Sequence, residues 1–112
     1  MAITITQSST FTKRLKEARK NKGISQKKLG IEAGIDEFSA SARMNQYEKG
    51  KHTPDFKMSQ KLAEILSVPT SYFYEEDDVL AKILQMYYSL SNIDKEGMLN
   101  KIEYLAKNDV VN

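Results

Sequence analysis

Residues 25–48 read S-Q-K-K-L-G-I-E-A-G-I-D-E-F-S-A-S-A-R-M-N-Q-Y-E, and this pattern predicts a helix, a turn and a second helix. Ser25 is a favourable N-cap, and Leu29 and Ala33 lie four residues apart on one face of the first helix. Gly34 suits the sharp turn that must follow. This stretch decides the fold, because the rest of the chain must supply the core that both helices share.

The second helix of this stretch has one apolar face and one polar face. Ala40, Met44 and Tyr47 recur at i, i+4, i+7 and predict the buried face. The opposite face carries a hydroxyl, two amides and a guanidinium, which are groups that suit the edges of bases in a DNA major groove. The residues that point away from the core are Ser41, Ala42, Arg43, Asn45 and Gln46.

Four motifs follow one another over residues 14–73. They are R-L-K-E-A-R-K-N-K-G-I-S-Q-K-K-L-G, A-G-I, N-Q-Y-E-K-G-K-H-T-P-D and K-L-A-E-I-L-S-V-P-T-S-Y-F. In this order they resemble the phage Cro/C1-type (Xre-family) helix-turn-helix domain. The resemblance implies an all-α fold, with a five-helix, lambda-repressor-like DNA-binding domain. It also implies a sequence-specific transcriptional regulator of phage or prophage type, a repressor, with double-stranded operator DNA as its partner.

The spacing between Gly34 and Glu48 is about four residues longer than in the resembling domains. Two starts of the recognition helix are compatible with it. Either Ser39 caps a helix of the usual length, or Asp36 caps a helix that is one turn longer. Counting back from Glu48 favours Ser39, and so predicts a recognition helix at residues 39–48 with Phe38 on the preceding loop, covering the edge of the core.

With this register, the resemblance assigns base reading to Ser41, Ala42 and Gln46, with Arg43 and Asn45 beside them. A helix N-terminus and neighbouring lysine side chains attract anions, so Gln26 and Lys27 at the start of the first helix of this stretch are expected to bind phosphate. The resemblance implies the same role for Lys49 and Lys51 in the loop after Glu48.

The resemblance also implies a buried ion pair between Arg19 in the first helix and Glu48, which closes the recognition helix. The other cations of the first helix are expected to form a solvated face; they are Lys13, Arg14, Lys16 and Lys20.

Three segments are expected along the chain. Residues 1–11 form a flexible N-terminal arm, residues 12–75 the DNA-binding domain, whose first helix starts at about Thr12, and residues 76–112 a two-helix hairpin after an acidic boundary at residues 75–78. The hairpin carries apolar stripes at helical spacing, namely Val79, Leu80, Ile83, Leu84, Tyr87 and Leu90, then Met98, Leu99, Ile102 and Leu105.

Such apolar stripes are expected to pack against another surface, which is either the N-terminal domain or a second copy of the chain. We expect a homodimer, because one five-helix domain grips a single half-site too weakly for an operator.

The distribution of charge along the chain indicates which partners each part faces. Residues 1–69 hold 13 Lys and Arg against 7 Asp and Glu, whereas residues 70–112 hold 4 against 8. A basic first part is expected to face phosphates, and an acidic second part protein or solvent. The alternative reading is therefore an antitoxin-like DNA-binding module whose main partner is another protein.

Several functions are not expected from this sequence. It has no cysteine, which excludes disulfides and agrees with a cytoplasmic protein, and it has no apolar run of membrane-spanning length. No nucleophile, Walker or zinc-protease motif occurs, and His52 has no partner nearby in sequence. We therefore expect no enzyme activity, no metal, no cofactor and no small-molecule ligand.

Overall fold

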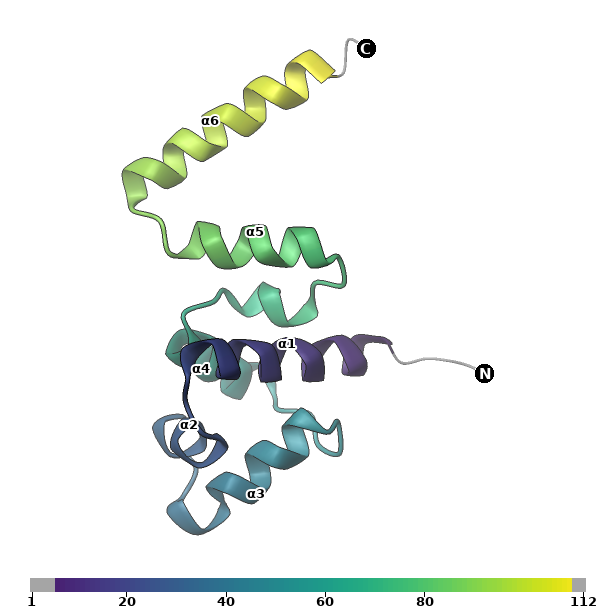
Figure 1. The fold of residues 1–112 in the computed structure, drawn as a ribbon, viewed down its shortest axis with the longest axis vertical. Helices are drawn as coiled ribbons and strands as arrows, with labels where there is room; N and C mark the ends of the chain where they lie inside the picture. The colour runs from purple at the N-terminus through teal and green to yellow at the C-terminus, as the bar shows by residue number, and fades with distance from the viewer. Residues whose placement is uncertain (1–5, 110–112) are drawn as a thin grey trace.

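The computed structural model describes residues 6–109, and within them every regular element is helical, which confirms the all-α prediction. The elements are α1 (Thr6–Lys22), α2 (Gln26–Glu32), α3 (Glu37–Glu48), α4 (Phe56–Leu66), the 3-10 helix η1 (Thr70–Tyr74), α5 (Asp78–Tyr88) and α6 (Asn92–Asp109). Figure 1 shows α1 lying across the domain, α2 and α3 on one side of it, and η1 and α5 on the other, with α6 extending away from α5.

Five elements share one core. Each of α1, α2, α3, α4 and η1 contributes at least one side chain with no exposed surface; these are Leu15, Leu29, Met44, Leu62 and Phe73. Burying a large apolar side chain contributes about 1.5–3 kcal/mol. Tyr72 is buried next to Phe73, so the aromatic pair closes the core.

The first helix starts earlier than the sequence predicted. α1 begins at Thr6 and not at about Thr12, so residues 6–11 of the expected flexible arm are helical, and residues 1–5 lie outside the described part. The physical reason is packing, because the buried ring of Phe11 lies 4.9 Å from the ring of Phe73 and 5.5 Å from that of Tyr74. This contact outweighs the modest helix propensity of the Thr- and Ser-rich segment.

Arg14, which was expected to be solvated, binds the start of α5 to α1. Lys13, Lys16 and Lys20 are exposed as expected, but Arg14 is 3% exposed. Its Nε donates to the carbonyl of Glu75 at 2.9 Å, and its Nη2 donates to Oδ1 of Asp78 at 3.0 Å. The acidic residues 75–78 therefore form the attachment of α5.

Lys13 also binds Oδ1 of Asp78 at 3.0 Å. Hydrogen bonds from Lys13 and Arg14 lower the pKa of the Asp78 carboxyl.

The last two helices leave most of their apolar surface uncovered. α5 buries Ala81 against the rest of the domain, whereas α6 buries no residue and extends away from the end of α5 (Figure 1). The two helices diverge, so neither covers the stripe of the other. The exposed stripes contain Val79, Leu80, Ile83, Met86 and Tyr87 on α5, and Met98, Leu99, Ile102 and Leu105 on α6.

Candidate nucleic-acid interface

The pair α2 and α3 is held together at very close range. Ser25 caps α2, since its side chain accepts a hydrogen bond from the backbone N–H of Lys28 at 3.0 Å. Gly34 follows α2 with a φ of +96°, a left-handed conformation that favours glycine. Gly30 lies against α3, where a Cβ would stand 2.9 Å from the Cβ of Ala40. Because Gly30 has no side chain, α2 and α3 can pack in direct contact.

α3 is one turn longer than the favoured prediction. Asp36, and not Ser39, is the N-cap, because Oδ1 of Asp36 accepts from the backbone N–H of Ser39 at 3.0 Å. Glu37 lies in the first turn, where the helix dipole favours a negative charge. The prediction that Ser39 starts the helix is therefore wrong, and the longer alternative is correct. Phe38 belongs to the helix and is fully exposed, so it does not cover the core edge.

The five residues expected to read bases lie on the outer side of α3. The inner side is formed by Ala40, Met44, Tyr47 and Glu48, all of which are buried. Ser41, Ala42 and Arg43 are exposed, and Asn45 and Gln46 are half-buried. The outer face therefore presents short side chains first and longer polar ones at its second half.

A polar network fixes the end of α3 to α1 and α2. Arg19 Nε donates to Oε2 of Glu48 at 2.5 Å, and Nη2 donates to Oε1 at 3.2 Å. The two side chains are only 14% and 3% exposed. Gln26 at the start of α2 donates to Oε1 of Glu48 at 3.1 Å and to Oδ1 of Asn45 at 3.4 Å. The angle between α2 and α3 is thus set by charge-assisted hydrogen bonds as well as by packing.

Cations stand at both ends of α3. Beside its first turn, Nζ of Lys27 lies 3.7 Å from Oε2 of Glu37, with both side chains mostly exposed. At its last turn, Lys49 is the C-cap, and the backbone N–H of Lys51 donates to the carbonyl of Gln46 at 2.9 Å. Gly50, with a φ of +75°, makes this turn possible. Lys49 and Lys51 are both exposed, close to the outer face of α3.

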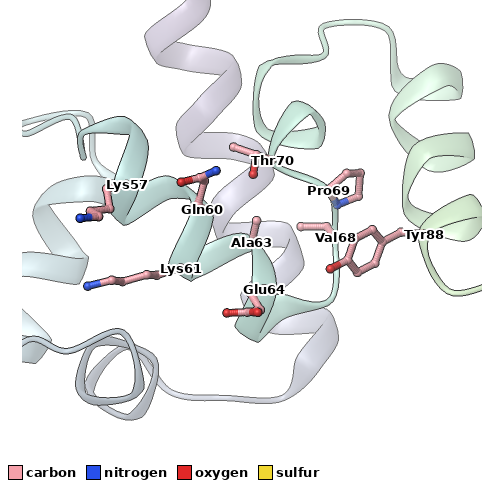
Figure 2. Close-up of a pocket in the computed structure, with 9 residues that line it drawn as sticks. All are labelled: Lys57, Gln60, Lys61, Ala63, Glu64, Val68, Pro69, Thr70 and Tyr88. Carbon is pink, nitrogen blue, oxygen red and sulfur yellow. The ribbon is translucent and has the colours of Figure 1, made fainter.

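A hollow lies on another part of the molecule. It has a volume of about 410 Å³ and lies between α4, the segment after it and the end of α5. Figure 2 shows the Tyr88 ring beside Val68 and Pro69, while Lys57 and Lys61 extend from α4. Its lining contains both polar and apolar side chains, and these do not form the arrangement of a catalytic site.

Within residues 6–109 no group of His, Cys, Asp and Glu could hold a metal ion, and no helix is long and apolar enough to span a membrane.

The roles of three residues were not identified from the sequence, namely Gly30 and Phe38 in this region and Arg14 at the attachment of α5. Gly30 gives no sequence signal of its own, because its role depends on which residue of α3 faces it. Arg14 was grouped with its solvated neighbours, although its position one residue before Leu15 placed it beside the core. Phe38 precedes Ala42 by four residues, and this spacing would have placed it on the outer face once the longer helix was assumed.

Comparisons with known proteins agree with this geometry. The helix-turn-helix domain family matches residues 12–79. Among solved structures, the crystal structure of the transcriptional regulator BswR is similar, with a TM-score of 0.78 and 46% sequence identity. The alignment covers 83% of this chain and 92% of that chain. No curated protein matches the chain.

Proposed function

The chain belongs to the helix-turn-helix domain family, and we propose that it regulates transcription by placing α3 in the major groove of operator DNA. The observation that carries the proposal is the outer face of α3, which presents polar side chains to solvent and is flanked at both ends by lysines. A recognition helix in such domains contacts base edges while the preceding helix crosses the backbone. The similarity to BswR, a transcriptional regulator, supports the same function.

We assign base reading to Ser41, Ala42, Gln46, Arg43 and Asn45. Gln46 is the principal reader, because an amide can donate and accept together at an adenine edge, and the small Ser41 and Ala42 allow close approach. Asn45 already accepts a hydrogen bond from Gln26, which occupies part of its amide. Arg43 is fully available on the exposed side of the helix.

Phosphate binding is assigned to Gln26, Lys27, Lys49 and Lys51. Gln26 stands at the N-terminus of α2, where the helix dipole favours an anion, and the lysines lie at the two ends of α3. Phosphate contacts fix the register of the protein on the duplex, so they position the reading face without carrying sequence information.

We further propose that the chain acts as a repressor and a homodimer, paired through the exposed stripes of α5 and α6. These stripes have no cover in the described chain, and two half-sites give an operator affinity that one domain does not reach.

The test of the dimer is Ile102→Asp, with Asn100→Asp as the control on the opposite face of α6. Both residues are exposed, so both variants fold. In sedimentation, only Ile102→Asp should become monomeric; a dimer that survives this change contradicts the assignment.

The experiment that tests DNA recognition is a selection of bound sequences from random duplex DNA. The wild-type chain should enrich one sequence with two related half-sites. Gln46→Ala should relax the preference at one base pair per half-site and cost about 1–3 kcal/mol on the best sequence. If no sequence is enriched, the proposed function is wrong. If Gln46→Ala leaves the preference unchanged and Asn45→Ala alters it, Asn45 is the principal reader.

One observation also favours a second candidate, the antitoxin-like module. α6 is apolar along one side and uncovered, which suits a different protein as well as a second copy. A chain that binds DNA as a monomer, with α6 still exposed, would support this candidate over the homodimer.

A further inference from the structure

Phe38 is the most exposed large apolar side chain in the described part of the chain. Its ring is 101% exposed, although it belongs to the second position of a well-capped helix. Exposing a ring to water gives no stability to the fold, since burial of apolar surface is what stabilises it. The ring is therefore free to be covered by whatever approaches α3.

The position of Phe38 on α3 determines what that partner is. Phe38, Ala42 and Asn45 recur at i, i+4, i+7, opposite the buried face of Ala40 and Met44. Phe38 thus extends the outer face by one turn toward the N-terminus. Four residues of helix rise about 6 Å, which is roughly two base-pair steps of duplex DNA.

The charges around Phe38 permit a close approach of DNA. The ring borders a hollow that is also lined by Lys27, Glu37 and Ser41. The Glu37 carboxylate, which alone would repel phosphates, has Nζ of Lys27 at 3.7 Å. The nearby Asp36 carboxylate is occupied as the N-cap, where it accepts from the backbone N–H of Ser39.

We propose that Phe38 is a further base-reading residue, whose ring contacts the 5-methyl group of a thymine at one edge of each half-site. The inference rests on the proposed function, namely that α3 lies in the major groove. A phenyl ring has no hydrogen-bond donor or acceptor, so it reads no polar base edge, and the thymine methyl is the apolar feature of the major groove. The residues at the N-terminus of a recognition helix are those that contact base edges.

The test removes one methyl group at a time. The preferred duplex is first obtained by selection from random DNA with the wild-type chain, and each thymine is then replaced singly by deoxyuridine. Wild-type affinity should fall about fourfold at the thymine that Phe38 contacts, because one buried methyl group is lost. Phe38→Ala should bind the unmodified duplex about tenfold more weakly, and it should no longer distinguish thymine from deoxyuridine at that position.

Phe56→Ala is the matched control. Phe56 is the first residue of α4, is 64% exposed and does not belong to α3. It should leave both affinity and the deoxyuridine profile unchanged. Thermal unfolding of Phe38→Ala should equal that of the wild type, since the ring is not buried.

Two results would overturn the inference. One is wild-type binding that is insensitive to every thymine replacement; the other is a Phe38→Ala chain with the wild-type profile, which would point to a protein partner for the ring. A wild-type chain that selects no sequence at all refutes the proposed function itself, and is thereby distinguishable from both.

Discussion

The ion pair between Arg19 and Glu48 makes the sharpest prediction about stability. In the variant Arg19→Met, the Glu48 carboxylate, 3% exposed, loses both arginine hydrogen bonds and keeps Gln26 as its side-chain donor. Removing one partner of a buried pair costs about 3–5 kcal/mol, because an unpaired charge stays in the interior. Such a loss lowers Tm by at least about 10 °C for a domain of this size.

Glu48→Gln should cost less, about 1.5–3 kcal/mol. The remaining guanidinium is 14% exposed and still donates to the carbonyl of Ile24 at 3.0 Å. The double variant should cost less than the sum of the single losses, with a coupling of at least about 1 kcal/mol.

Urea unfolding of the wild type, both single variants and the double variant measures this cycle. Lys16→Met, the same kind of change at an exposed position of α1, is the control and should stay within about 0.5 kcal/mol. Additive losses below about 1 kcal/mol each would refute the reasoning, because they are typical of an exposed pair.

Three further predictions concern other contacts. Gly30→Ala should destabilise the domain by about 1–3 kcal/mol in urea unfolding, because the new Cβ would stand 2.9 Å from the Cβ of Ala40. The control Gly97→Ala, where a Cβ would meet nothing within 4 Å, should not destabilise it. Equal unfolding midpoints for the two variants would contradict this prediction. The pKa of Asp78 lies below its ordinary value of 3.8. The wild type should therefore be more stable than Asp78→Asn above pH 3.8, and this difference should vanish as the pH falls through the lowered pKa. A stability difference that persists in strong acid would be incompatible with this prediction. Lys51→Ala should weaken binding to all duplexes alike and reduce the slope of log K against log salt by about 1; a changed base preference would show that Lys51 does not bind phosphate.

The helical class and the inner face of the central helix pair could be predicted from the sequence. Leu29, Ala33, Met44 and Tyr47 are spaced for burial, and the structure buries them. This succeeded because apolar periodicity is a local property that any neighbouring core must respect. The contact between Arg19 and Glu48 followed from family resemblance and not from periodicity, since residues 29 positions apart have no local relation.

The start of α3 could not be decided locally. Asp36 and Ser39 are both good N-caps, and the structure decides for Asp36, whose Oδ1 accepts a hydrogen bond from the backbone N–H of Ser39. The same choice moves Phe38 from a loop to the outer face, so a local ambiguity changes the proposed reading surface.

The sequence by itself determined which segments become helices and which faces are apolar. Only the tertiary structure decided that Phe11 extends α1, that Arg14 is buried beneath Glu75 and Asp78, and that α6 is left uncovered. The reason is physical, because helix formation depends on neighbours three or four residues away, whereas burial of a ring, a guanidinium or an apolar stripe depends on which distant residues the fold brings against it.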